Sequence, residues 1–261
     1  MYEKLLTKIR RKYLFIFVLT FFSILFSSLI VRNSGEVSGI LVLTFAMIPL
    51  IEIINKFLEK EIIHVEATED KNIFIRHKEF IFCYFSIFFS SILAFYISYI
   101  LFPDIFIQQV KAIEQLREEV LIYAYSFRKD AFFSFILINN LKVAFMFFVF
   151  SIIFGAGSVY LLLWNSSIIG IFLGISAEKY TNGIFSKYII YPLISFIKLL
   201  PHGILEFLGF FFASLAGGIL ILSFIKVNNL KEAQQYISDS ILLLLFSIVF
   251  IVLGAFIEAF L

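Results

Sequence analysis

The stretch PHGILEFLGFFFASLAGG, residues 201–218, decides the fold class of this chain. It is an apolar run that opens with Pro, His and Gly. Proline is tolerated in the first turn of a helix, where its missing N–H would have no partner. After Glu206 no charge occurs until Lys226. The sequence therefore predicts a helix from Pro201 to about residue 226, apolar and long enough to cross a membrane.

One face of this predicted helix combines ionisable and small residues. His202 and Glu206 are four positions apart and share a face. Gly209, Ala213 and Gly217 continue it as a stripe of small residues that lets another helix approach closely. Ionisable residues within a membrane helix are candidates for a functional site. The alternative is that His202 and Glu206 lie at the headgroup level and only cap and anchor the helix.

Composition places the whole chain in the membrane class. Hydrophobic residues make up 61% of the chain and charged residues 15%, against about 45–50% and about 25% in soluble domains. The net charge of +2 does not indicate nucleic-acid binding, and the single Cys83 permits no disulfide within the chain. Nucleotide-binding glycine loops, zinc-protease motifs and nucleophile elbows are absent from the sequence. We predict a non-enzymatic, all-α polytopic transmembrane bundle without a cofactor.

The apolar runs predict the order of the membrane spans. The predicted long spans are residues 13–31, 37–56, 79–102, 141–163, 201–226 and 240–261. Five basic residues and only Glu3 precede the first span, so the positive-inside rule predicts a cytoplasmic N-terminus in a multi-pass protein of the cell membrane.

Two further segments have a different character. Residues 167–177 form an apolar piece of about 17 Å as a helix, too short for a bilayer core of about 30 Å. The polar break Glu178–Gly183 and an apolar piece ending at Leu200 follow. We therefore predict short, broken helices, which are typical of a buried interior or a cavity. Residues 104–130 alternate apolar and charged positions every three to four residues and predict an external amphipathic helix that packs on the bundle or docks a partner.

The stretch also carries a resemblance to a known family. PHGILE, together with NNLKVAFMF at 139–147 and FGAGSVYLLLWNSSIIG at 154–170, resembles the stage II sporulation protein M family of integral membrane proteins over about residues 79–261. Asn165-Ser166 departs from the Asn-Gly that this family usually shows. We therefore predict two domains: residues 1–73, a transmembrane helical hairpin with a cytoplasmic loop, and residues 74–261, the family-like membrane domain.

The resemblance implies a protein that binds partners, because the bacterial namesake acts in sporulation with cell-wall-remodelling proteins. If residues 139 and 202 lie near the same membrane surface, one polar site would contain Asn139, Asn140, His202 and Glu206. Predicted helix-packing residues are Pro201, Gly203, Gly155, Gly157, Gly170, Gly174, Gly209, Ala213 and Gly217.

Three functions are compatible with these features. The first is a membrane scaffold, homodimeric through its small-residue stripes, that recruits membrane or envelope proteins. The second is a transporter or channel for a small solute or ion that uses His202 and Glu206. The third is an intramembrane metalloenzyme. Because two ligands are too few for a zinc site, we predict no metal centre, with His202 and Glu206 as the nearest approach to one.

Overall fold

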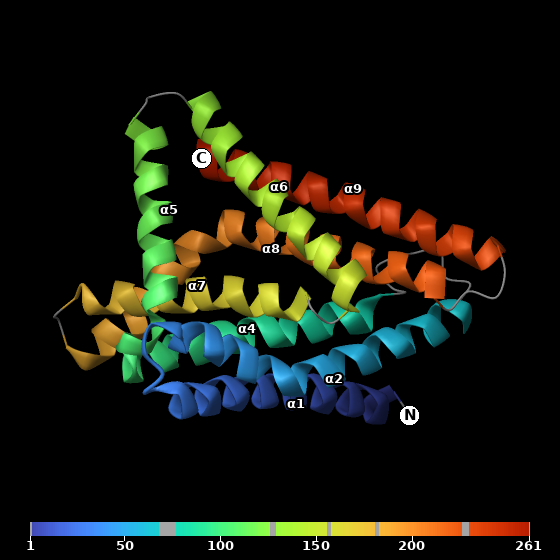
Figure 1. Ribbon diagram of the computed structural model, residues 1–261, viewed down its shortest axis with the longest axis horizontal. Coiled ribbons are helices and arrows are strands. Elements are labelled where there is room, and N and C mark those ends of the chain that lie inside the picture. Colours follow the sequence, from blue (N-terminus) through green and yellow to red (C-terminus); the bar gives the residue numbers. More distant parts are fainter. Residues whose placement is uncertain are drawn as a thin grey trace. The chain divides into compact units, whose positions relative to one another are not determined.

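The computed structural model describes residues 2–67, 77–125, 129–155, 158–180, 183–225 and 230–260 of the chain, and these form helices joined by short turns (Figure 1). The α-helices are α1 (Tyr2–Val31), α2 (Ser38–Ala67), α4 (Lys78–Leu101), α5 (Ile107–Tyr125), α6 (Lys129–Phe154), α7 (Ser158–Glu178), α8 (Tyr191–Ile225) and α9 (Leu230–Phe260). Shorter helical turns are η1 (Gly35–Val37), η2 (Pro103–Phe106) and the π-helical η4 (Ser186–Ile190).

Seven helices in the described part of the chain are long and apolar enough to cross a membrane. The spans are Arg11–Val31, Gly35–Asn55, Lys78–Leu101, Lys129–Phe154, Ser158–Glu178, Ser186–Ile221 and Ala233–Phe260. The predicted all-α, polytopic helical class is therefore confirmed. The predicted end of the third span is also found, because α4 stops at Leu101, before the Phe102-Pro103 step that disfavours helix.

Among the described residues, the predicted short, broken helices are replaced by the long helices α7 and α8. Residues 167–177 belong to the 21-residue helix α7, which also replaces the end of the predicted 141–163 span. Polar side chains within α7 bond back to their own helix: Asn165 donates to the Leu161 carbonyl oxygen at 2.8 Å and Ser166 donates to that of Leu162 at 2.8 Å. Their polar groups are thus satisfied without a break.

The chain is instead interrupted at two glycines. Gly155, after α6, has φ +55°, and Gly183, before η4, has φ +68°. Glycine adopts this left-handed conformation without the steric cost that other residues meet. Pro201, predicted to open a helix, lies inside the 35-residue helix α8, where its missing N–H removes one backbone hydrogen bond without ending the helix.

Contacts divide the chain into two compact units. Unit 1 comprises Met1–Glu114 and Val159–Leu193, and unit 2 comprises Gln115–Ser158 and Ile194–Leu261. Each unit therefore draws on two separate parts of the sequence. The predicted boundary at residue 73 was drawn from where the family resemblance begins, and it stays a prediction.

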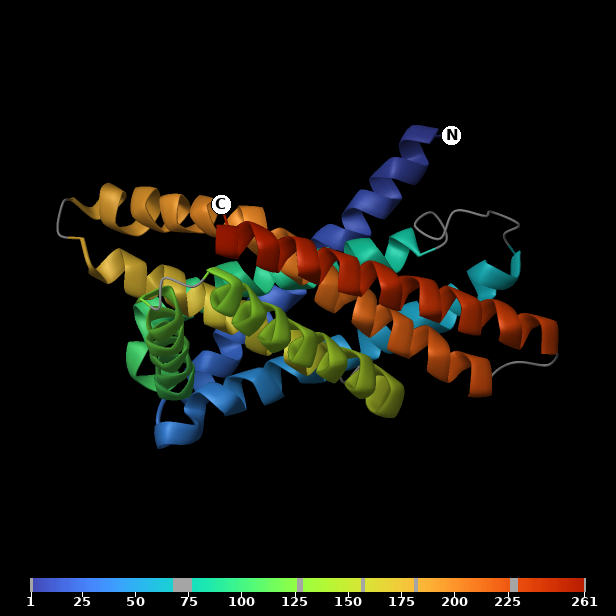
Figure 2. The same ribbon diagram turned by 90° about the horizontal axis from the view of Figure 1, so that it is seen from above.

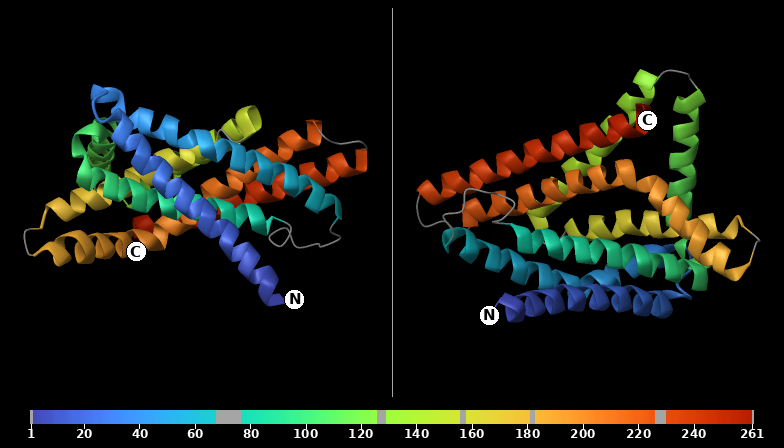
Figure 3. Two further views of the ribbon diagram at one scale, coloured as in Figure 1. Left: turned by 90° about the horizontal axis from the view of Figure 1, so that it is seen from below. Right: turned by 180° about the vertical axis from the view of Figure 1, so that it is seen from behind.

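In unit 1, α1 packs on α2 and α4 and crosses α4 (Figure 3, left). Hydroxyl groups support these contacts: the Ser28 Oγ donates to the Ser98 Oγ at 3.1 Å and the Ser90 Oγ donates to the Phe17 carbonyl oxygen at 2.6 Å. Helix α7 packs on α4 through Gly170, where an added Cβ would lie 2.6 Å from the Ile92 carbonyl oxygen. Such close approach is typical of membrane helix pairs.

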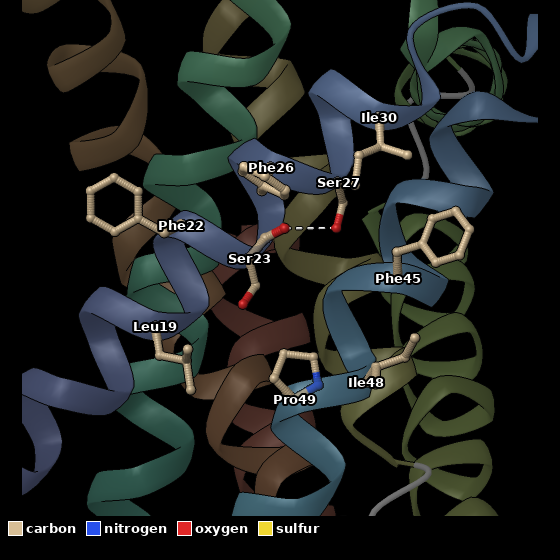
Figure 4. Close-up of a pocket in the computed structure, with 9 residues that line it drawn as sticks. All are labelled: Leu19, Phe22, Ser23, Phe26, Ser27, Ile30, Phe45, Ile48 and Pro49. Atoms are coloured by element: carbon tan, nitrogen blue, oxygen red, sulfur yellow. Dashed lines mark hydrogen bonds between the residues drawn. The ribbon is translucent and has the colours of Figure 1, made fainter.

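A groove of about 480 Å³ lies between α1 and α2 in unit 1 (Figure 4). Pro49 of α2 lines it, and Ser27 donates a hydrogen bond to the Ser23 carbonyl oxygen at its edge. The other lining residues are apolar: Leu19, Phe22, Phe26, Ile30, Phe45 and Ile48. This surface suits lipid chains, because its one polar contact is satisfied within α1.

Unit 2 contains α6, α9 and most of α8. Helices α6 and α9 lie side by side (Figures 1 and 2). Between α6 and α8, the Phe147 and Phe210 rings stack with centroids 5.6 Å apart. The Ser214 hydroxyl of α8 lies 3.0 Å from that of Ser151 and donates to that of Ser158 at 2.9 Å. Aromatic packing and a chain of hydroxyl groups thus hold α8 to its neighbours.

Candidate functional site

A carboxyl group inside a membrane span is the centre of the candidate site. Glu206 lies on α8 within the span Ser186–Ile221. Its Oε1 accepts a hydrogen bond from the Asn140 Nδ2 of α6 at 2.6 Å. Its side chain is also in hydrogen-bonding contact with that of Glu258 on α9. Three helices of unit 2 therefore meet at one polar cluster.

Gly254 allows α9 to come close enough for this contact. A Cβ added at Gly254 would lie 2.9 Å from the Glu206 Cγ and 3.4 Å from the His202 carbonyl oxygen. Gly254 and Glu258 are four positions apart, so they share the α9 face that meets α8. The glycine brings the two backbones together, and the glutamate one turn later faces Glu206.

The two predicted asparagines, Asn139 and Asn140, lie on different faces of α6. Its buried residues are Ile136, Asn140, Ala144, Phe147 and Ser151, which recur every three to four positions and form one face. Asn140 therefore points into unit 2, where it meets Glu206. Asn139 is exposed and lines a separate cavity between α5 and α6. Of the predicted pair, only Asn140 belongs to the cluster.

His202 has a different place from the one predicted. It shares a face with Glu206, but no hydrogen bond joins the two side chains in the described part of the chain. The imidazole is half-buried and lies in the interior of α8 rather than at a helix opening. The predicted helix start at Pro201 is therefore wrong, because α8 already begins at Tyr191.

Some of the predicted packing residues of α8 contact a neighbouring helix, and others do not. A Cβ added at Gly209 would lie 3.1 Å from the Ser247 carbonyl oxygen of α9, and one added at Gly217 would clash with the Phe148 carbonyl oxygen of α6. Ala213, between them, is 1% exposed. Gly203 meets only Leu199 of its own helix, and Pro201 is exposed.

In unit 1, Gly170 and Gly174 face α4, the latter against the Tyr99 ring. Gly155 has its positive φ at the end of α6, and Gly157 lies outside the described residues.

The contacts of Gly209 with α9 and of Gly217 with α6 show that helices of the same chain cover the stripe from Gly209 to Gly217.

The contact between the Glu206 and Glu258 carboxyl groups needs a proton or a cation to be stable. Two carboxylate anions in contact repel each other strongly where water is scarce. Asn140 supplies one amide donor, which satisfies one lone pair of Glu206 but adds no positive charge. The pair is stable when a proton or a cation lies between the carboxyl groups. Among the described residues, no three His, Cys, Asp or Glu side chains gather, so the three protein ligands of a zinc site are not brought together.

Sequence reasoning missed Glu258 and Gly254. The signal was present: Glu258 is an acidic residue in an apolar span, four positions after a glycine. This is the same spacing that links His202 to Glu206. A single sequence, however, does not show which face of one span contacts which face of another.

Comparison with protein families matches residues 79–261 to the family described as Stage II sporulation protein M. No curated protein and no solved structure matches the chain. The match covers α4 to α9 and includes Asn140, Glu206 and Glu258, the three residues of the polar cluster. The chain is an integral membrane protein that belongs to the stage II sporulation protein M family.

Proposed function

We propose that this protein is a non-enzymatic membrane transport protein in which the Glu206–Glu258 pair binds a cation or a proton. The observation that carries this proposal is the contact between two carboxyl groups on α8 and α9, inside two membrane spans. Ionisable side chains at such positions mark ion pathways and proton relays in many transporters. Release of the ion would leave two repelling anions, so binding is coupled to how closely α8 and α9 approach.

The same unit shows what a purely structural polar contact looks like. Ser151, Ser214 and Ser158 link α6, α8 and the start of α7 through neutral hydroxyl groups. Neutral groups hold helices together at a much lower desolvation cost than carboxylates do. Two carboxyl groups in contact are a costly way to join helices, which supports a role in ion binding.

The test is the melting temperature of the protein in lipid nanodiscs at neutral pH. The buffer cation is choline, and Na⁺, K⁺ or Ca²⁺ is then added in turn. A bound cation at 100 times its Kd stabilises the folded state by about 2.7 kcal/mol. We expect one cation to raise the melting temperature of the wild type, and not that of Glu206→Gln or Glu258→Gln.

Glu118→Gln is the matched control, because Glu118 is an exposed glutamate of α5 outside the cluster. Uptake of the stabilising cation, or of protons, into proteoliposomes under an imposed gradient then tests transport itself. An equal cation effect in wild type and Glu206→Gln would overturn the proposed ion site.

A membrane scaffold that recruits membrane or envelope proteins is the second candidate. It is favoured by α5, whose residues Glu114, Arg117 and Glu118 are exposed and form no ion pair within the described residues. A charged helical face of this kind suits a partner helix of complementary charge. A homodimer would have to use a face other than Gly209–Gly217, which α6 and α9 already cover.

Crosslinking mass spectrometry in native membranes tests the scaffold. A charge reversal at both Arg117→Glu and Glu118→Lys should remove crosslinks from α5 to a partner while leaving crosslinks within unit 2 unchanged. Light scattering of the purified protein, corrected for bound detergent, reports whether it is a dimer. Identical crosslinks in the variant and the wild type would exclude α5 as the docking face.

A further inference from the structure

A second polar site lies on the opposite face of α6 from Asn140. An open cavity of about 740 Å³ lies between the C-terminal half of α5 and the first half of α6, all within unit 2. Its size falls in the range of small-molecule sites, about 300–1,000 Å³. Its lining residues are Glu119, Ile122, Ala131, Ser134, Phe135, Ile138, Asn139 and Lys142.

The α6 residues of this cavity form one continuous stripe. They recur at intervals of three or four positions, as one face of a helix does. The stripe begins with the small and apolar residues near the start of the helix and ends at Asn139 and Lys142. A ligand that follows it would therefore meet apolar groups over part of its length and an ammonium group at one end.

Lys142 lies near the middle of the 26-residue helix α6, about 20 Å from its first residue at ~1.5 Å per residue. It is exposed and forms no ion pair within the described part of the chain. A lysine at this depth is costly unless an anion accompanies it. We therefore expect an anionic group in the cavity to neutralise the Lys142 ammonium group.

Glu119 supplies the opposite charge from α5. Its carboxylate accepts a hydrogen bond from the Gln115 amide at 3.1 Å but forms no ion pair in the described residues. Apolar groups nearby are uncovered: Ile122 is 68% exposed and Ile138 is 52% exposed. The cavity thus combines a separate cation, a separate anion and apolar walls that need a cover.

We propose that this cavity binds a phospholipid with a zwitterionic head that carries a primary ammonium group, with the phosphate at Lys142 and the ammonium at Glu119. The acyl chains would cover Ile122 and Ile138, which a free phosphate ester could not do. A primary ammonium donates hydrogen bonds to a carboxylate, whereas a quaternary ammonium has no N–H to donate. The site is separate from the Glu206 cluster and independent of the proposed transport.

Native mass spectrometry of the detergent-solubilised protein tests the proposal. The probes are short-chain phosphatidylethanolamine, phosphatidylcholine and phosphatidylglycerol, and free phosphoethanolamine. We expect phosphatidylethanolamine to bind at least about tenfold more tightly than each other probe, because each lost charge-assisted hydrogen bond lowers affinity by about that factor. Glu119→Gln should remove the preference over phosphatidylcholine and phosphatidylglycerol, whereas Lys142→Gln, which loses the phosphate contact common to all three phospholipids, should weaken the binding of each of them.

Matched controls keep the result interpretable. Glu118→Gln alters the neighbouring glutamate, and Lys198→Gln alters an exposed lysine in another span of unit 2; neither residue lines the cavity. Both controls should bind as the wild type does. Equal binding of phosphatidylglycerol, equal binding of free phosphoethanolamine, unchanged selectivity in Glu119→Gln, or unchanged phospholipid affinity in Lys142→Gln would each overturn the proposal.

Discussion

At the scale of single residues, Glu206 depends on partners from two other helices. Asn140 donates to it at 2.6 Å, and Glu258 contacts it from α9. A carboxyl group in a membrane span has no water to replace a lost donor. The cluster should therefore respond to each partner individually, in stability as well as in ion binding.

Asn140→Leu tests the donor. The change keeps the branched shape of the side chain but leaves the Glu206 oxygen without its amide partner. We expect a loss of about 1–3 kcal/mol in the free energy of unfolding. Asn139→Leu is the control, because Asn139 is exposed and outside the cluster; it should change stability by less than about 0.5 kcal/mol. Thermal melting in nanodiscs measures both, and equal losses would contradict the assigned hydrogen bond.

Part of this cluster could be predicted from the sequence. Asn140 and Glu206 are polar residues in apolar spans, which membrane physics marks as functional candidates. Asn139 and Asn140 could not be told apart, because a rotation of about 100° per residue sends neighbours to different faces and only packing decides which face is buried. Glu258 could not be assigned, because its partner is 52 positions away in the chain.

At the scale of elements, glycines decide how closely the helices of unit 2 approach. Gly254 brings α9 to the backbone of α8 at His202, while Gly209 and Gly217 bring α8 to α9 and α6. The stripe Gly209–Ala213–Gly217 was predictable as a close-packing face from its spacing. Which helices cover it was not, since the same stripe also suits a second copy of the chain.

Gly217→Ala tests this packing. Its added methyl group would clash with the Phe148 carbonyl oxygen and lie 2.9 Å from the Ser151 Cβ. We expect α6 and α8 to separate, at a cost of about 1–3 kcal/mol. Gly203→Ala is the matched control, because its methyl group meets only the Leu199 side chain at 3.4 Å. Alanine favours helix over glycine by up to about 1 kcal/mol, so this control should melt at the same temperature as the wild type or higher.

Helix ends were harder to predict than helix existence. The polar run Asn165–Ser167 resembles a turn, yet its side chains bond back to the carbonyl groups of α7 and the helix continues. Pro201 resembles a helix start, yet α8 begins ten residues earlier, at Tyr191. In both places tertiary packing outweighs a local preference of a few kcal/mol at most.

At the scale of the whole molecule, the seven candidate spans of the described residues and the basic N-terminal segment predict a topology. If the N-terminus is cytoplasmic, successive spans place α5 and the turn after α7 outside the cell. We predict that single cysteines at Glu114→Cys and Lys179→Cys, in a Cys83→Ser background, react with an impermeant maleimide in intact cells. Arg11→Cys should react only after lysis. Labelling of Arg11→Cys but not Glu114→Cys in intact cells would reverse the topology.

The most direct test of the ion-binding cluster is infrared spectroscopy of the protein in nanodiscs, in choline buffer at neutral pH. A carboxyl pair that shares a proton has a C=O stretching band of a protonated acid, which ionised surface carboxylates lack. We predict that this band is present in the wild type and in Glu118→Gln, is lost in both Glu206→Gln and Glu258→Gln, and weakens when the stabilising cation is added. A wild-type spectrum without the band, or a band that survives both substitutions, would contradict a proton shared between Glu206 and Glu258.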